Sequence, residues 1–232
     1  MDKIEHIKGT FDRQTPPRRT DISAAVIRRL PRYHRYLSEL LRCDRLRISS
    51  SELSRMMGVT ASQIRQDLNC FGGFGQQGYG YNVKYLHGKI SELLGINAGY
   101  RAVIIGAGNL GRALAASHMF ERRGVTRLAM FDVSPTLIGT TWAELPVLDV
   151  ACLEDFCREQ AVEIAVLTTP KESAEEVARR AAAAGVRGIW NFSNMELRLP
   201  DSSVLIQNMH IGDSLMTLCY ELFSREAGEE DS

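Results

Sequence analysis

The chain has 232 residues, of which 44% are hydrophobic and 24% charged, proportions typical of a soluble globular protein with room for two domains. It has neither an apolar stretch near the roughly 20 residues that span a bilayer nor the apolar core of a signal peptide, so we expect a cytoplasmic protein. The formal net charge is zero, yet residues 1–90 hold 16 Lys/Arg against 8 Asp/Glu and residues 91–232 hold 12 against 20. A polyanion-binding module joined to a separate domain has this asymmetry, although a solvated surface alone gives the same counts.

Cysteine usage gives no sign of a metal site or a disulfide framework. The five cysteines are scattered and include no C-x-x-C pair. Zinc sites and disulfide frameworks need paired or regularly spaced cysteines, so we expect neither and interpret the five as buried or incidental thiols. They are Cys43, Cys70, Cys152, Cys157 and Cys219.

The N-terminal region predicts a small helical domain. Residues 1–20 combine charge and proline without apolar periodicity, and we expect a disordered basic leader there. A helix is predicted from Pro31, which a first helical turn tolerates, and residues 24–30 form either a separate helical turn or its kinked beginning. Its buried stripe consists of Tyr33, Tyr36, Leu37, Leu40 and Leu41.

Two capping boxes mark the starts of two short helices. Ser49 precedes Glu52, and Thr60 precedes Gln63, at the spacing in which each partner bonds a free backbone N–H of the other. Gly58, which lies between them, suits the positive φ of a helix end. The pattern predicts a helix-turn-helix. Its two helices are residues 50–57 and 61–71.

A stretch rich in glycine and aromatic residues follows and predicts the wing of a winged helix. Aromatic side chains need a surface to pack on, so a tight β-hairpin over residues 72–81 explains them better than a disordered linker. Residues 83–94 have the spacing of an amphipathic helix that ends at Gly95. We place the winged-helix domain at 21–85 and a connecting helix and linker at 86–99.

From residue 100 onward, apolar strands alternate with amphipathic helices, which is typical of a parallel sheet covered on both faces. We therefore predict an α/β fold in which a Rossmann domain, a doubly wound parallel sheet, occupies 100–211. A last helix at 212–226 and an acidic tail at 227–232 follow it. The predicted strands are 102–105, 127–131, 164–168, 188–191 and 204–207, and the predicted helices are 110–122, 171–184 and 212–224.

A glycine-rich turn after the first of these strands has the dinucleotide fingerprint G-x-G-x-x-G. Its glycines serve a tight turn, the close approach of a pyrophosphate, and helix–strand packing. Asp132 stands 21 residues after this turn, where a carboxylate accepts hydrogen bonds from ribose hydroxyls and repels the 2′-phosphate of NADP. The pattern favours NAD(H); the alternative is a turn that binds nothing. The fingerprint is Gly106, Ala107, Gly108, Asn109, Leu110 and Gly111.

A catalytic group for hydride transfer is not evident. Tyr85 and Lys89 have the Y-x-x-x-K spacing of short-chain dehydrogenases, but they precede the Rossmann strands instead of following them, so we interpret the match as chance. His118 and His210 are the other candidates, and a lone histidine is more often a surface or packed residue than a catalyst. We expect no enzyme; the alternative is an NAD-dependent dehydrogenase with an N-terminal accessory domain.

The second helix of the helix-turn-helix presents polar side chains in its first turns, where a recognition helix meets base edges. Any small helical domain can imitate this pattern, but the basic leader and the wing strengthen it. We predict binding to double-stranded DNA through Thr60, Ser62, Gln63, Arg65, Gln66, Gln77, Gly78 and Tyr79.

Between residues 22 and 223 the chain resembles the Rex family of redox-sensing transcriptional repressors. The resemblance implies a homodimer that binds a palindromic operator. The C-terminal helix of each subunit would swap into the partner's Rossmann–wing junction. Binding of NADH would close the dimer and release it from DNA. It also places Thr169, Pro170, Asn191 and Phe192 in the cofactor site. The matching stretches are 63–68 (QIRQDL), 71–75 (FGGFG), 78–83 (GYGYNV), 106–111 (GAGNLG), 131–133 (FDV) and 188–192 (GIWNF).

Several positions depart from the family pattern. Gln66 stands where relatives carry a lysine, and Gln77 replaces a wing arginine. In the polar trio that couples cofactor state to domain orientation, Arg35 is retained, but a tyrosine is Ser117 and an aspartate is His210. We expect cofactor binding to persist, and the coupling between NADH and DNA to depend on pH near about 6.5, where histidine titrates.

These patterns together predict an NAD(H)-responsive repressor. A dehydrogenase would ignore DNA. A protein-binding module without a cofactor, the third alternative, would be indifferent to NADH.

Overall fold

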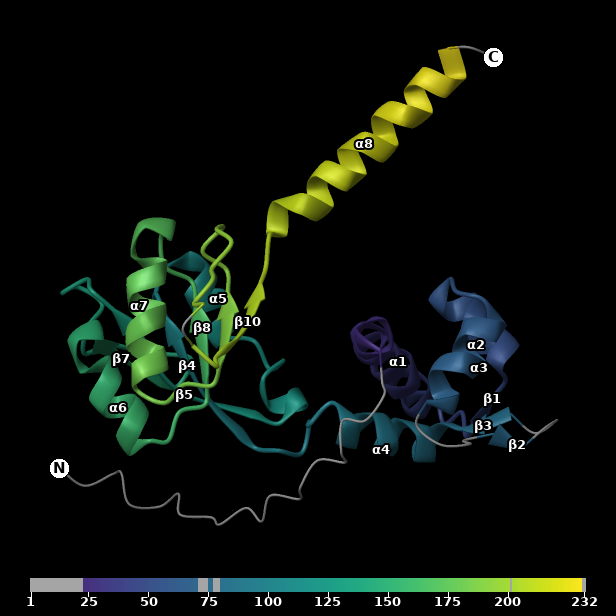
Figure 1. The fold of residues 1–232 in the computed structure, drawn as a ribbon, viewed down its shortest axis with the longest axis horizontal. Helices are drawn as coiled ribbons and strands as arrows, with labels where there is room; N and C mark the ends of the chain where they lie inside the picture. Colours follow the sequence, from purple (N-terminus) through teal and green to yellow (C-terminus); the bar gives the residue numbers. More distant parts are fainter. Residues whose placement is uncertain (1–22, 71–74, 77–79, 201, 231–232) are drawn as a thin grey trace. The chain divides into compact units, whose positions relative to one another are not determined.

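The computed structural model describes residues 23–70, 75–76, 80–200 and 202–230 (Figure 1). The chain separates into two compact units, residues 1–98 and 99–232. The predicted basic leader, Phe71 and the wing residues Gln77, Gly78 and Tyr79 lie outside the described residues.

The described residues of the N-terminal unit form four helices and a small antiparallel sheet with strand order β1-β3-β2. Buried Leu53, Ile64 and Leu86 belong to its core. Gly58 ends α2 in the left-handed region at φ 63°, as the turn between the two short helices requires. The elements are α1 (Ala24–Arg42), β1 (Arg47–Ile48), α2 (Ser50–Met57), α3 (Ala61–Asn69), β2 (Gly75–Gln76), β3 (Gly80–Asn82) and α4 (Val83–Leu93).

Residues 24–30 are the beginning of the first helix, which is one of the two predicted alternatives. Ser23 caps it by accepting a hydrogen bond from the backbone nitrogen of Val26 at 3.3 Å, so Pro31 lies inside α1 and not in its first turn. Proline costs one backbone hydrogen bond there. The loss is offset because α1 buries a continuous apolar stripe on both sides of the proline, including Leu30 and Tyr33.

Strand β1 was not predicted, and it shows why the chain needs a glycine at position 80. Ile48 of β1 pairs with Tyr81 of β3. Gly80 has φ +69°, and a Cβ there would lie 2.6 Å from the carbonyl oxygen of Ile48. Only glycine accommodates both the left-handed backbone and this close approach.

Two histidines face each other where α1 packs on α4, with ring centroids 4.4 Å apart. Nε2 of His34 contacts Oγ of Ser91 at 3.2 Å, and Nε2 of His87 contacts Oγ of Ser38 at 2.9 Å. Each serine hydroxyl donates its only hydrogen to the carbonyl oxygen four residues earlier, so both Nε2 atoms must carry a proton. The histidine pair therefore links the two helices by donating to both serines.

We expect this pair to make the stability of the N-terminal unit depend on pH. Burial lowers the pKa of His87 because it disfavours the charged ring. The unfolded chain then binds more protons than the folded chain as the pH falls through about 6.5, so the free energy of unfolding decreases between pH 7.5 and pH 5.5. The melting temperature Tm of His87→Leu should change less than that of the native protein across this range.

The matched control is His118→Leu, which removes an exposed histidine and should keep the native pH dependence. If the two variants had the same dependence of Tm on pH, the proposal that the His34–His87 pair makes stability depend on pH would be wrong.

The C-terminal unit is built on a seven-stranded sheet with strand order β10-β9-β8-β4-β5-β7-β6, parallel except for the pair β6–β7. Crossovers leave the central strand β4 in both directions, which is the doubly wound arrangement of a Rossmann domain and confirms the predicted fold class. The strands are β4 (Tyr100–Ile105), β5 (Val125–Asp132), β6 (Thr141–Trp142), β7 (Leu145–Asp149), β8 (Ile164–Leu167), β9 (Gly188–Asn191) and β10 (Leu205–Asn208).

Helices cover both faces of this sheet. Alternate strand residues point to opposite faces, so Val103 and Ile105 pack with residues of α6 and α7, whereas Ile104 packs with residues of α5. The helices are α5 (Asn109–Ala115), α6 (Leu153–Glu159), α7 (Lys171–Ala183) and α8 (Ile211–Glu230), with 3-10 turns η1 (Glu121–Arg123) and η2 (Val150–Cys152).

The helix predicted over 110–122 is shorter, because α5 ends at Ala115. Oγ of Ser117 accepts a hydrogen bond from the backbone nitrogen of Met119 at 3.3 Å, a local bond that competes with helix. The chain then turns Phe120 into the core, where its ring packs edge-on to Trp190 with centroids 6.2 Å apart. The prediction also missed β6, β7 and α6, which are short and lack a clear apolar period.

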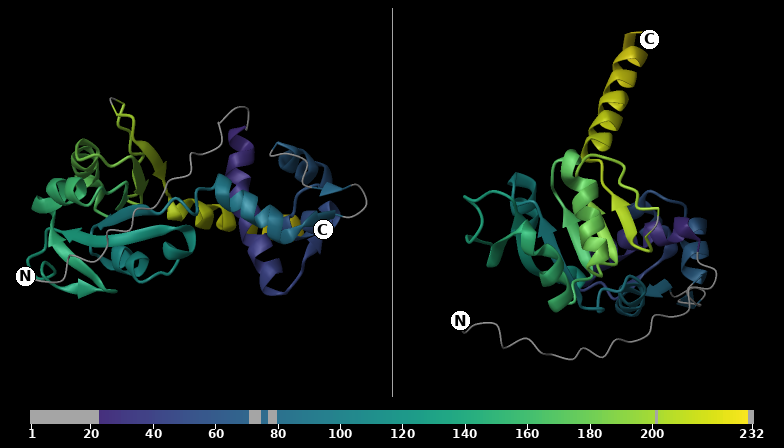
Figure 2. Two further views of the ribbon diagram at one scale, coloured as in Figure 1. Left: turned by 90° about the horizontal axis from the view of Figure 1, so that it is seen from below. Right: turned by 60° about the vertical axis from the view of Figure 1, so that its left-hand side comes forward.

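Helix α8 follows β10 (Figure 2). Its apolar side chains are exposed. The exposed fraction is 62% for Leu215 and 71% for Phe223. Within the part of the chain that the structure describes, none of the helices combines the length and apolar character needed to cross a membrane.

Candidate functional site

The predicted dinucleotide fingerprint forms the turn between β4 and α5, and its three glycines meet different surroundings. Gly106 has φ +105°, and a Cβ there would lie 2.7 Å from the carbonyl oxygen of Thr168. A Cβ on Gly111 would lie 1.9 Å from the carbonyl oxygen of Gly106. A Cβ on Gly108 would meet nothing within 4 Å. Two glycines thus close the turn, and Gly108 leaves open space beside it.

Asp132 ends β5, the neighbour of β4, and its carboxylate joins the turn. Oδ2 accepts a hydrogen bond from the backbone nitrogen of Ala107 at 2.6 Å, and Oδ1 accepts one from the backbone nitrogen of Ser134 at 2.9 Å. A carboxylate offers about four acceptor positions, so Asp132 keeps capacity for ribose hydroxyls. Asn109 and Leu110 form the first turn of α5, which no side chain caps.

The strand on the other side of β4 contributes a second group. Oγ1 of Thr168 donates to the carbonyl oxygen of Gly106 at 2.8 Å and so ties the end of β8 to the glycine turn. Oγ1 of Thr169 is buried and has no hydrogen-bond partner among the described residues. Pro170 follows it and precedes α7. An unpartnered buried hydroxyl is costly, and a ligand group beside the turn would satisfy it.

Asn191 ends the next strand, β9, and Phe192 follows it. Nδ2 of Asn191 donates to the carbonyl oxygen of Met195 and to Oδ1 of Asn208, and its Oδ1 accepts from both the backbone nitrogen and the hydroxyl of Ser193. The amide is thus saturated by the protein itself. The ring of Phe192 stacks at a tilt on Trp190, with centroids 4.6 Å apart.

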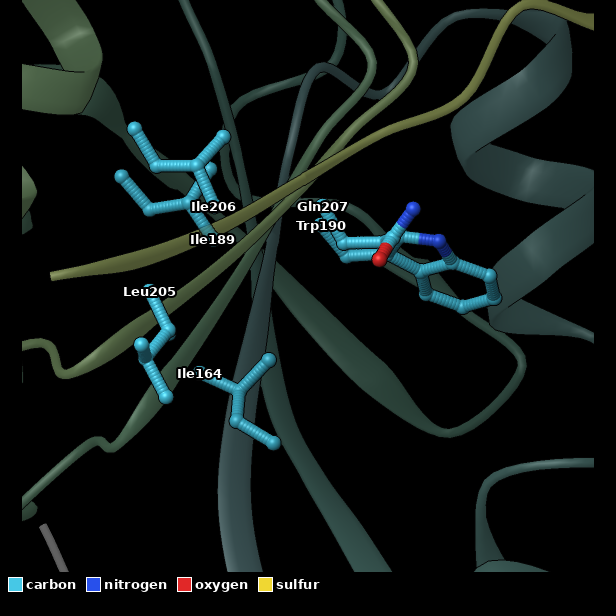
Figure 3. A pocket seen from close by; sticks show the side chains of 7 residues that line it. Ile164, Ile189, Trp190, Leu205, Ile206 and Gln207 are labelled. Atoms are coloured by element: carbon cyan, nitrogen blue, oxygen red, sulfur yellow. The ribbon is translucent and has the colours of Figure 1, made fainter. Parts of the chain in front are cut away.

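A shallow groove of about 390 Å³ lies elsewhere on the sheet (Figure 3). Its lining comes from β8, β9 and β10, and it includes Ile164, Trp190 and Gln207. Figure 3 places Trp190 and Gln207 next to each other, in agreement with their pairing across β9 and β10. Ile164 is the first residue of β8, whereas the glycine turn lies at the carboxyl ends of the strands. None of the residues that line the groove belongs to the glycine turn.

The helix predicted to contact DNA is α3, and it presents only part of the predicted set outward. Ser62, Arg65 and Gln66 are exposed. Thr60 caps the helix by accepting from the backbone nitrogen of Gln63 at 3.1 Å. Gln63 is half-buried, and its Nε2 donates to Oδ1 of Asp67 at 2.8 Å. Asp67 was not singled out from the sequence, because its partners lie mostly on α1.

The predicted switch residues are divided between the two units. Arg35 is exposed on α1, with its guanidinium 5.3 Å above the ring of Tyr36. Ser117 lies in the turn after α5. His210 immediately precedes α8, and its Nε2 lies 3.2 Å from Oε2 of Glu196, a partner that the sequence did not predict. The hydrogen bond from His210 lowers the pKa of Glu196.

Other predicted features fall as follows. Tyr85 and Lys89 lie on α4, where Nζ of Lys89 pairs with Glu92 at 2.7 Å. Cys157 is buried and the other four cysteines are exposed. Among the described residues, no group of three histidine, cysteine or carboxylate side chains is placed to hold a metal ion.

Family models match both units. The model described as "Putative DNA-binding protein N-terminus" matches residues 21–69, and the model described as "CoA binding domain" matches residues 97–195. The first match lies within the N-terminal unit, and the second lies in the C-terminal unit except for its first two residues.

Characterised relatives match nearly the whole chain. The redox-sensing transcriptional repressor Rex of Thermoanaerobacter pseudethanolicus is 50% identical over 217 residues, which cover 91% of this chain and 96% of the relative. The repressor of the same name from Clostridioides difficile is 52% identical over 200 residues, which cover 86% and 95%.

Three crystal structures of a protein named RSP, one of which is described as a Rex-family repressor, each match with a TM-score of 0.83. The complex with beta-NAD⁺ and operator DNA is 50% identical and covers 91% of this chain and 97% of that chain. The complex with beta-NADH is 46% identical and covers 92% and 100%. On the strength of this identity across both units, the chain belongs to the Rex family of redox-sensing transcriptional repressors.

Proposed function

We propose that this protein is an NAD(H)-responsive transcriptional repressor that binds operator DNA through its N-terminal unit and NAD(H) through its C-terminal unit. The observation that carries the proposal is the glycine turn, which is closed at Gly106 and Gly111 and open at Gly108. The complexes of RSP with NADH, and with NAD⁺ and operator DNA, support it. We propose a cytoplasmic regulator and no enzyme.

An electrophoretic shift on the protein's own upstream DNA tests the function. The native protein should retard the DNA, and NADH should release it. Coenzyme A is the matched control ligand, because it also carries a pyrophosphate. No retardation would contradict DNA binding, and retardation that ignores NADH would contradict the cofactor response.

The cofactor contacts that we propose surround the carboxyl ends of β4, β5, β8 and β9. The open side of Gly108 takes the pyrophosphate, Asp132 accepts from ribose hydroxyls, and the hydroxyl of Thr169 donates to the ligand. Asn191 acts as a positioning residue, because its amide is already saturated. The rest of the proposed site comprises Gly106, Ala107, Asn109, Leu110, Gly111, Pro170 and Phe192.

Asp132→Ala should weaken NADH binding by about tenfold and reduce the discrimination against NADPH. The variant loses an acceptor for ribose hydroxyls, and it also loses the repulsion of a phosphate on that ribose. The repulsion applies equally to the ribose phosphate of coenzyme A, which is why we favour NAD(H) as the ligand. Calorimetric titration with NADH, NADPH and coenzyme A measures all three affinities, and unchanged values would remove Asp132 from the site.

The DNA contacts that we propose come from α3 and the wing. Ser62, Arg65 and Gln66 face outward, and Thr60 holds the start of the helix. Arg65 also donates from Nη1 to Oγ of Ser50 at 3.2 Å, which orients its side chain toward the start of α2. Gln63 and the wing residues Gln77, Gly78 and Tyr79 complete the proposed set.

Gln66→Lys should change base preference at one operator position from A·T toward G·C. Glutamine pairs with adenine N6 and N7, whereas lysine pairs with guanine O6 and N7, and a good pair discriminates by about 1–3 kcal/mol. Selection from a randomised half-site library measures the preference. Ser62→Ala is a neighbouring control that keeps Gln66, and identical consensus sequences for Gln66→Lys and native protein would place Gln66 against phosphate or solvent.

We propose that the protein acts as a homodimer in which α8 swaps into the Rossmann–wing junction of its partner. The support is the set of exposed apolar side chains on α8, such as Leu215, Leu218 and Leu222, because an amphipathic helix is normally stabilised by burying its apolar side. We also propose that the switch involves Arg35, Ser117 and His210. In this structure His210 contacts Glu196. We propose that a change of dimer state breaks this contact and brings His210 to Arg35 instead.

A further inference from the structure

Asp67 of α3 is a buried carboxylate whose acceptor positions are all used. It is 1% exposed. Oδ2 accepts from Nε of Arg29 at 2.7 Å and from the hydroxyl of Tyr33 at 2.9 Å, and Oδ1 accepts from Nη2 of Arg29 at 2.7 Å and from Nε2 of Gln63 at 2.8 Å. Four donors match the roughly four lone-pair sites of a carboxylate.

The carboxylate of Asp67 stays charged in spite of its burial. Burial raises its pKa, but the hydrogen bonds from Arg29, Gln63 and Tyr33 outweigh burial and lower the pKa overall. An ionised carboxylate only accepts hydrogen bonds. The group that faces it from Gln63 must therefore be the amide nitrogen, and the amide cannot turn over without setting two oxygens against each other.

This restraint leaves a defined set of groups on Gln63. One N–H is used by Asp67, so the carbonyl oxygen and the second N–H remain. Gln63 lies in the first turn of α3, the part of a recognition helix that approaches base edges. A carbonyl beside an N–H is the combination that pairs with N6 and N7 of adenine. By comparison, Gln66 lies on the exposed face of the same helix, where its amide can take either orientation.

We propose that Asp67 is a positioning residue for DNA recognition, which orients the Gln63 amide so that its carbonyl and remaining N–H read an adenine. Arg29 and Tyr33 complete the device, because they hold the carboxylate from α1 and so tie the recognition helix to it. This inference rests on the proposed repressor function and adds a base preference and its structural cause.

The test is Asp67→Asn, studied by selection from a randomised half-site library. Asparagine offers a single oxygen, and Nε of Arg29 and the hydroxyl of Tyr33 together hold it at the position of Oδ2. The NH₂ group then takes the position of Oδ1, where it faces Gln63 and where the hydrogen bond from Nη2 of Arg29 is lost. The Gln63 amide then reverses and presents its two N–H donors outward. We expect the preference at one position to move from adenine to guanine, whose O6 and N7 both accept, by about tenfold or more.

Tyr33→Phe is the matched control, because it removes one hydrogen bond from Asp67 without touching the Gln63 amide. It should lower thermal stability and keep the adenine preference. Gln63→Leu keeps Arg29, Tyr33 and Asp67 together and should lose the preference at that position, which provides a readout if Asp67→Asn fails to fold.

The possible outcomes distinguish a failure of the proposed repressor function from a failure of the proposed role of Asp67. A native protein that selects no sequence would refute the proposed repressor function and this inference with it. A native protein that selects a sequence, with Asp67→Asn or Gln63→Leu keeping the same consensus at uniformly lower affinity, would show that the cluster is only structural.

Discussion

Gly108→Leu is expected to weaken NADH binding by at least about 100-fold, which corresponds to roughly 2.7 kcal/mol, while the protein still folds. The backbone at Gly108 has φ −71° and ψ −171°, which a leucine adopts without strain, and a Cβ there meets no atom within 4 Å. The added side chain therefore fits the protein and occupies the space proposed for the pyrophosphate. Calorimetric titration with NADH measures the loss.

The control for this variant is Gly88→Leu, because Gly88 also has open space around its Cβ position but lies on α4 in the other unit. It should bind NADH like the native protein. Gly108→Leu should also keep its affinity for operator DNA, and that DNA complex should no longer respond to NADH. Native NADH affinity in Gly108→Leu would remove the glycine turn from the cofactor site.

Arg29→Met is expected to lower the free energy of unfolding of the N-terminal unit by about 3–5 kcal/mol, because it leaves a buried carboxylate without its cation. Three side chains among the described residues donate the four hydrogen bonds to Asp67, and of these only Arg29 is charged. Methionine keeps much of the length and apolar character of the arginine stem. Most of the expected loss is therefore electrostatic, and denaturant unfolding followed by circular dichroism measures it.

The pH dependence gives this prediction a second readout. The folded-state pKa of Asp67 lies below its ordinary value, so the native protein gains stability from it above about pH 4 and loses that gain as the pH falls. In Arg29→Met the Asp67 carboxylate no longer adds this stability. The difference in free energy of unfolding between the variant and the native protein should therefore become smaller at low pH. Arg28→Met, an exposed neighbour on α1, should change stability by no more than about 0.5 kcal/mol. Equal losses in the two variants would contradict the assignment.

The amino-acid sequence by itself determined the features that depend on neighbouring residues. The capping box of Ser49 and Glu52 is present as predicted, with both hydrogen bonds formed. The left-handed Gly58 and the glycine turn before α5 follow from backbone geometry that few residues adopt. The apolar runs of β4, β8 and β9 were recognisable because strands buried on both faces need no alternation. These signals were enough to predict the fold classes of the two units and the glycine turn at which we propose the nucleotide site.

Tertiary structure alone decided the features that depend on residues far apart in the chain. The long packing stripe of α1 carried the helix through Pro31, and the burial of Phe120 ended α5 early. Asp67 is charged and buried only because Arg29, 38 residues away, meets it from α1. The hydrogen bond of His210 to Glu196 likewise spans 14 residues and a strand. Such contacts leave no periodic trace in a sequence, because the energy that stabilises them comes from desolvation and pairing after the elements have packed.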